Sequence, residues 1–124
     1  MISMTAQFDA ALRSYERDEL VAAATGFEQV LASDPAHVEA RYKLANVRKE
    51  QGDLVAAEEH YLHVLGDAPD HAEALNNLGA VLEMSGRQAE AEARYRESIA
   101  RRADLAPPHA NLGRLLQSQQ RHEE

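Results

Sequence analysis

The chain contains no cysteine and no tryptophan. Without cysteine, disulfide bonds and thiolate nucleophiles are excluded, and structural zinc sites lose their most common ligand. A cysteine-free chain suits a reducing compartment, so we expect a cytoplasmic location.

Long apolar runs are also absent. No stretch approaches the roughly 18 consecutive apolar residues that a membrane-spanning helix requires. The opening residues, MISMTAQFDAALRSYERDEL, lack the basic segment and following apolar run of a signal peptide. The sequence therefore predicts no membrane partner.

Basic residues are scarce relative to acidic ones. The 13 Lys and Arg face 21 Asp and Glu, which gives a net charge of −8. Phosphate binding depends on clustered cations, so we expect no nucleic-acid partner. The net charge is −4 in residues 4–37, −3 in 38–71, −1 in 72–105 and 0 beyond, so the negative charge decreases along the chain. This gradient favours a basic protein partner at the N-terminal end.

What the sequence does contain is a repeat with a period of 34 residues. Such a period predicts a stack of similar units, each too small to bury its apolar surface alone. Five positions keep the spacing: Phe27, Tyr61 and Tyr95; Ala23, Ala57 and Ala91; Ala11, Ala45, Gly79 and Gly113; Leu31, Leu65 and Ile99; Pro35 and Pro69.

Each unit has the pattern of two amphipathic helices. Around Gly52, apolar residues recur at spacings of three and four on both sides. The glycine suits the turn that ends the first helix, and Pro35 and Pro69 stop the second helix. Small residues let the two helices approach closely, and the aromatic residues fill the space between units.

The spacing of Leu78-Gly79, Leu82, Gly86, Ala91 and Tyr95 resembles the tetratricopeptide repeat. This resemblance implies an all-α, right-handed superhelical α-solenoid. It implies a single domain over 1–124, with repeats 4–37, 38–71 and 72–105 and a partial fourth repeat or capping helix over 106–124. Because its last residues still follow the repeat, we expect the chain to be a piece of a longer protein. Eleven arginines against two lysines, with 23 alanines, indicate a GC-rich bacterial source.

Three positions depart from the pattern and leave the unit boundaries open. Asp18 replaces the turn glycine, Ala10 stands where later units have leucine, and Ala103 replaces the expected proline.

The resemblance also implies a concave groove lined by the first helix of each unit. Exposed asparagines there offer a donor and an acceptor to a peptide backbone, as in the asparagine ladder of O-linked N-acetylglucosamine transferase repeats. Asparagine is also simply common at this position, and Phe8, Leu12 and Tyr15 equally suit an apolar stripe covered by the N-terminal segment or a second copy. The predicted groove contacts are Phe8, Leu12, Tyr42, Lys43, Asn46, Asn76, Asn77, Asn111 and Arg114.

A carboxylate clamp of the kind that holds chaperone tails is disfavoured. Asn46 and Asn77 fit it, but Tyr42, Pro107 and Asn111 stand where the clamp needs cations.

No catalytic motif is recognisable. There is no glycine-rich phosphate loop and no nucleophile beside a base, so we expect no catalytic residues and no cofactor. His60 and His63 lie three residues apart, but two histidines without a third ligand predict no metal site.

The sequence therefore predicts a protein–protein interaction module or scaffold that binds a peptide segment of a partner. The alternative is an accessory or self-associating segment, and so a possible homo-oligomer, within a larger enzyme such as a transferase or hydroxylase. In that case the catalytic domain lies outside these residues.

Overall fold

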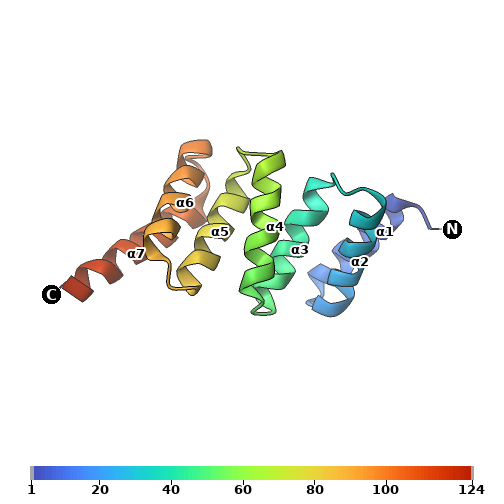
Figure 1. Ribbon diagram of the computed structural model, residues 1–124, viewed down its shortest axis with the longest axis horizontal. Helices are drawn as coiled ribbons and strands as arrows, with labels where there is room; N and C mark the ends of the chain where they lie inside the picture. The colour runs from blue at the N-terminus through green and yellow to red at the C-terminus, as the bar shows by residue number, and fades with distance from the viewer. Residues whose placement is uncertain (1, 124) are drawn as a thin grey trace.

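The structure is a computed structural model that describes residues 2–123, and every regular element in this part of the chain is an α-helix. Figure 1 shows the helices following one another along the long axis, from α1 near the N-terminus to α7 at the opposite end. The helices are α1 (Met4–Glu16), α2 (Leu20–Ser33), α3 (Val38–Glu50), α4 (Leu54–Asp67), α5 (Ala72–Met84), α6 (Gln88–Arg101) and α7 (Ala106–Glu123).

The helices pack as three successive pairs, α1 with α2, α3 with α4 and α5 with α6. Each second helix also packs against the first helix of the next pair, and α6 packs in this way against α7. The predicted all-α solenoid is confirmed. The extent of the domain and its repeat boundaries stay predictions. Among the helices described for residues 2–123, none combines the length and the hydropathy of a membrane-spanning segment.

The turn inside each pair depends on one residue with a positive φ. Gly52 and Gly86 both have φ of 81°, and Asp18 at the same position has φ of 58°. The N–H of Glu19 donates to the carbonyl of Ser14 over 2.9 Å, which matches the bond from Asp53 to Arg48. Aspartate is one of the few residues that tolerate this region, so the turn survives the loss of glycine.

The turn between pairs does not require proline. Helices α2 and α4 end immediately before Asp34-Pro35 and Ala68-Pro69. Helix α6 ends at Arg101, before a turn of the same length in which Ala103 replaces proline. The next helix then begins from a histidine N-cap in two cases: Nδ1 of His37 accepts from Ala40 over 3.0 Å, and Nδ1 of His71 accepts from Ala74 over 3.1 Å.

The last helix is longer than the other first helices. Helix α7 has 18 residues, whereas α1, α3 and α5 have 13 each. It runs straight through Gln120, the position that corresponds by the 34-residue offset to Gly52 and Gly86. A glutamine with no preference for positive φ allows the helix to continue there.

The small residues and the aromatic residues that recur every 34 positions meet in the core. Phe27, Tyr61 and Tyr95 are each 0% exposed. A Cβ added to Gly79 would lie 2.6 Å from Cε1 of Tyr95, so a hydrogen is all that fits there. In the first pair the approach is equally close, because a Cβ on Gly26 would lie 2.6 Å from that of Ala11.

Gly79 and Gly113 occupy the same repeat position but should respond oppositely to alanine. Gly79→Ala should lower the free energy of unfolding by about 1–3 kcal/mol, because the new methyl group collides with the fully buried ring of Tyr95. Gly113 has no atom within 4 Å of an added Cβ. Gly113→Ala should therefore raise stability by about 0.5–1 kcal/mol through lower backbone entropy of the unfolded chain. Urea denaturation measures both, and equal shifts of the same sign would contradict this packing.

Candidate functional site

Helices α1, α3, α5 and α7 form one surface, which we call the first-helix face. Side-chain hydrogen bonds cross directly from one first helix to the next along it. They form an asparagine network made of Tyr15, Tyr42, Asn46, Tyr61, Asn76, Asn77 and Asn111.

Asn46 is the centre of the network. Its Nδ2 donates to the hydroxyl of Tyr15 over 3.4 Å. Its Oδ1 accepts from the hydroxyl of Tyr61 and from Nδ2 of Asn77, the latter over 3.0 Å. The side chain is only 6% exposed, so these bonds satisfy a buried amide that would otherwise destabilise the fold.

Asn77 carries the network toward the C-terminal end. Its Nδ2 also donates to the hydroxyl of Tyr42 over 3.1 Å, and its Oδ1 accepts from Nδ2 of Asn76 over 3.2 Å. Oδ1 of Asn76 in turn accepts from Nδ2 of Asn111 over 3.0 Å. One connected set of hydrogen bonds therefore reaches from α1 to α7.

The tyrosines of the network remain neutral at physiological pH. Burial raises the pKa of Tyr15, of Tyr42 and of Tyr61 above the usual value for a phenol. A neutral hydroxyl keeps the proton that Tyr61 donates to Asn46. It can also accept, as the hydroxyls of Tyr15 and Tyr42 do from Asn46 and Asn77.

The predicted groove residues differ in how far they reach solvent. Tyr42, Lys43, Asn77 and Asn111 are partly exposed, and Arg114 is exposed, so all five can reach a partner. Asn46 and Asn76 are buried and bond within the network. The side chains of Asn46 and Asn76 hold those of Asn77 and Asn111 in place.

Phe8 and Leu12 are partly buried against the core formed by the first pair and α3. The ring of Phe8 lies 4.7 Å from that of His37 and 6.0 Å from that of Phe27, measured between centroids. These contacts show that much of the apolar stripe on α1 is covered by the chain itself.

Lys43 extends across two tyrosine rings. Its Nζ lies 5.0 Å from the ring centroid of Tyr15 and 5.7 Å from that of Tyr42. Both distances allow a cation–π interaction, so these rings present electron-rich faces on the first-helix face.

A second polar cluster lies between α5, α6 and α7. Nη1 and Nη2 of Arg114 donate to the carboxylate of Glu83 over 2.6 and 3.1 Å, and the hydroxyl of Tyr95 donates to the same carboxylate over 2.8 Å. The bonds from Arg114 lower the pKa of Glu83 below its usual range. A cavity of about 290 Å³ adjoins them, lined also by Ala80 and Met84.

Sequence reasoning selected Arg114 as a contact but did not select Glu83, Tyr15 or Tyr61. The signal was present as an offset between units, since Tyr15 and Asn46, Asn46 and Asn77, and Glu83 and Arg114 are each 31 residues apart. This spacing is one repeat shortened by about one helical turn, which places the two side chains across neighbouring first helices.

Acidic side chains flank the network at its N-terminal half. Asp9, Glu16, Glu39 and Glu50 are all exposed on α1 and α3. In contrast, Glu73 pairs with Arg102 and Glu83 pairs with Arg114 farther along the chain. The negative charge that remains available on this face therefore lies toward α1.

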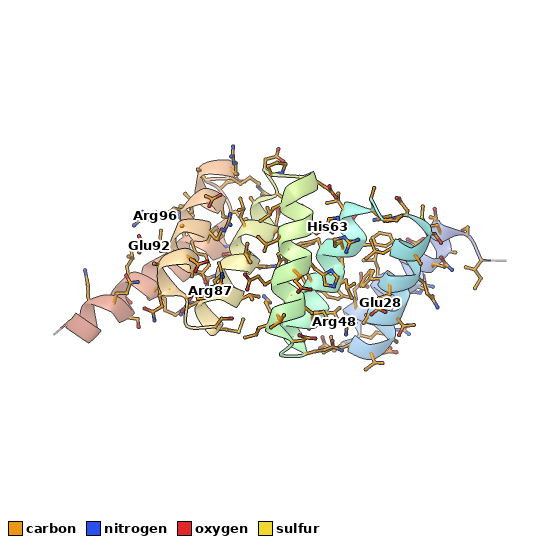
Figure 2. All side chains as sticks on the ribbon, in the orientation of Figure 1. Glu28, Arg48, His63, Arg87, Glu92 and Arg96 are labelled. Atoms are coloured by element: carbon orange, nitrogen blue, oxygen red, sulfur yellow. The ribbon has the colours of Figure 1, made fainter. Side chains whose placement is uncertain are left out.

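The opposite side of the stack carries surface ion pairs. Figure 2 shows Glu28 on α2 beside Arg48 on α3, and Glu92 and Arg96 one turn apart on α6. Glu92 and Arg96 pair over 3.0 Å, whereas Arg87, on the same side, bridges Glu58 and Glu90 over 2.7 Å each. Such exposed pairs contribute little individually.

His60 and His63 also lie on this opposite side. Nδ1 of His60 is 3.4 Å from Nη1 of Arg41, and burial with the nearby arginine lowers the pKa of His60. His63 is 3.7 Å from Asp67. Among residues 2–120, whose side chains the structure describes, no group of three His, Asp or Glu side chains could hold a metal ion.

The structure thus defines a helical-repeat protein with one continuous, hydrogen-bonded first-helix face. Two models of the tetratricopeptide repeat match the sequence, one over residues 5–70 and one over residues 38–104. Each covers more than half of the chain, and the chain belongs to the tetratricopeptide repeat family. Membership supports a general role as a protein–protein interaction module. Among curated proteins the search found no match.

Solved structures of the same fold are similar along nearly the whole chain. The first TPR of Spaghetti (RPAP3), solved with an HSP90 peptide, has 12% identity and a TM-score of 0.88, with 94% of this chain and 92% of that chain covered. The Arabidopsis OM64 TPR domain has 15% identity and a TM-score of 0.87, with 90% and 93% covered. An O-GlcNAc transferase of Thermobaculum terrenum has 22% identity and a TM-score of 0.86, with 94% and 23% covered.

The buried centre of the asparagine network should matter more for stability than its exposed end. Asn46→Ala should lower the free energy of unfolding by about 1–3 kcal/mol, because the hydroxyl of Tyr61 and the amide of Asn77 lose a buried partner. Asn111→Ala, at the partly exposed end, should cost clearly less because water can replace its bond. Urea denaturation of both variants tests the order, and a larger loss for Asn111→Ala would contradict it.

The Glu83–Arg114 pair should contribute a pH-dependent share of stability. Because the folded-state pKa of Glu83 is lowered, its contribution is full above the usual carboxyl range and falls away as pH drops through the lowered pKa. Glu83→Gln should therefore destabilise the protein near neutral pH and have a smaller effect near pH 3. Denaturation midpoints at both pH values measure this, and a constant difference would show that the charge is unimportant.

Proposed function

We propose that the first-helix face binds an extended segment of another protein, with Tyr42, Lys43, Asn77 and Asn111 as the central contacts. The observation that carries this proposal is that Asn77 and Asn111 are held in place by hydrogen bonds to the buried side chains of Asn46 and Asn76. Tyr42 accepts a hydrogen bond from Asn77 in turn, and Lys43 lies over the rings of Tyr15 and Tyr42. Groups fixed before binding lose less conformational entropy on association. Binding by these residues involves no catalytic step.

Backbone recognition is the mechanism that best suits these contacts. Asn111 donates one hydrogen bond to Asn76 and has a second N–H and a carbonyl oxygen for a peptide group. The hydroxyl of Tyr42 accepts from Asn77 and can donate its own proton outward. Such groups bind the main chain of an extended peptide with little dependence on its side chains.

Charge and aromatic rings add a preference for basic segments. Asp9, Glu16, Glu39 and Glu50 are exposed on α1 and α3, the two helices that carry Tyr15 and Tyr42. The rings of these tyrosines lie within cation–π distance of the ammonium of Lys43. A lysine or arginine of the partner would gain both carboxylate and ring contacts there.

The shared fold also supports peptide binding, since the first TPR of Spaghetti was solved with a bound peptide. That peptide is acidic at its C-terminus, and Tyr42, Pro107 and Asn111 stand in this chain at the positions where a clamp for such a tail needs cations.

A random linear-peptide library displayed on phage provides a probe for this surface. Peptides selected on the wild-type chain should be enriched in Lys and Arg. Synthetic copies should bind Asn77→Ala/Asn111→Ala about 10-fold or more weakly by fluorescence anisotropy, the loss expected from one or two hydrogen bonds. Affinity should also fall with added salt.

The matched control is Leu62→Ala on α4, which removes an exposed apolar side chain from the opposite side. Its peptide affinity should equal that of the wild type, and circular dichroism should show equal helicity for all variants. Enrichment of acidic peptides would reject the charge preference. Equal binding by the double-asparagine variant would reject this face as the binding surface.

A further inference from the structure

The cavity of about 290 Å³ between α5, α6 and α7 opens on the first-helix face, close to the asparagine network. Figure 1 shows these three helices together at the C-terminal end of the row. Ala80 and Glu83 of the lining are partly exposed, and Met84 and Arg114 are exposed. The fifth lining residue, Tyr95, is fully buried. A side chain that approaches from solvent can therefore enter the cavity.

Comparison with the second unit explains how this space arises. Ala80 occupies, by the 34-residue offset, the position of Asn46, whose buried side chain accepts a hydrogen bond from the hydroxyl of Tyr61. Tyr95 corresponds to Tyr61, but alanine offers its hydroxyl no partner, and the hydroxyl donates to Glu83 instead. The position that an asparagine side chain fills in the second unit is thus left open in the third.

The edge of the cavity is apolar at a position where other units carry charge. Met84 corresponds to Glu16 on α1 and Glu50 on α3, which are both exposed. The side chain of Met84 is itself 56% exposed, and among the described side chains of α3, α5 and α7 it is the one large apolar group with such exposure. An exposed apolar group beside a cavity favours an apolar occupant.

The charged groups at the cavity already bond to one another. Both Nη atoms of Arg114 donate to the carboxylate of Glu83, and the hydroxyl of Tyr95 donates a third hydrogen bond to it. A charged side chain from a partner would have to compete with these charge-assisted bonds. An apolar side chain leaves them intact, so the charges at the cavity also favour an apolar occupant.

The cavity lies within reach of a segment bound at the proposed peptide contacts. Ala80 follows Asn77 by three residues on α5, and Arg114 follows Asn111 by three residues on α7. Three residues span about 4.5 Å along a helix, a distance that an extended chain covers in one to two residues. A segment held by the two asparagines therefore has a side chain close enough to enter the cavity.

We infer that this cavity receives one apolar side chain of the segment that binds the first-helix face. The inference rests on the proposed function and adds that the partner segment carries an apolar residue beside its basic residues. A cavity of roughly 150 Å³ can hold a group the size of benzene, so this one is large enough for a single apolar side chain. The basic residues of the segment lie toward α1 and α3, and the apolar residue lies toward α7.

Peptides selected on the wild-type chain from the random phage library provide the probe. They should share an apolar residue at one position relative to their basic residues. Changing that residue to alanine in a synthetic copy should weaken binding to the wild type about 10-fold by fluorescence anisotropy, the loss expected when one apolar side chain is no longer buried. Ala80→Asn, which restores the asparagine of the second unit, should weaken binding of the parent peptide to a similar extent. It should bind the alanine-substituted peptide as the wild type does.

Ala89→Asn provides the matched control, because Ala89 is exposed on α6 and lies outside the cavity. This variant should bind both peptides as the wild type does, and circular dichroism should show equal helicity for all variants. In ¹H–¹³C NMR spectra of the wild type, the methyl signal of Met84 should shift on addition of the parent peptide. The same signal should shift much less with the alanine-substituted peptide.

The outcomes separate failure of this inference from failure of the proposed function. If Asn77→Ala/Asn111→Ala loses affinity while Ala80→Asn binds the parent peptide as the wild type does, the face binds peptides but the cavity plays no part. If the double-asparagine variant also binds as the wild type does, both the proposed binding surface and this inference are wrong. A shared acidic residue in place of the apolar one would overturn the inference in favour of a carboxylate bound at Arg114.

Discussion

The structure depends on the contact between a small residue on each first helix and an aromatic ring on its second helix. Tyr95 lies so close to Gly79 that a single methyl group does not fit between them. Ala45 with Tyr61 occupies the same place in the second pair, where both are completely buried. Because each ring also packs toward the next pair, this contact sets the spacing within a unit and the stacking between units.

That spacing in turn determines what the first-helix face can do. Stacked first helices bring residues 31 and 35 positions apart within hydrogen-bonding distance, as Asn46 and Asn77 or Asn76 and Asn111 show. The stack thus converts a periodic sequence into one connected polar surface. Its buried members stabilise the arrangement, and its partly exposed members remain available to a partner.

The repeat pattern was enough to predict the helices, because periodicity reports burial and turn residues directly. Repeat position predicts the positive φ of Gly52 and Gly86. It also predicts the complete burial of Tyr61 and Tyr95. The continuation of α7 through Gln120 could not be predicted from the loss of the turn glycine alone, because the turn at Asp18 survives the same loss.

The state of individual side chains was much harder to predict. Column position placed Asn46 and Asn76 on the first-helix face, but it did not reveal that both are 6% exposed and bonded to neighbours. Those bonds depend on tyrosines from other helices, including Tyr61 from α4. The repeat position of a single residue does not indicate such pairings.

The most direct test of the proposed binding surface is the ¹H–¹⁵N NMR spectrum of the chain with a selected peptide. The side-chain amide signals of Asn77 and Asn111 should shift with the backbone signals of α3, α5 and α7. Shifts confined to α2, α4 and α6 would contradict the account.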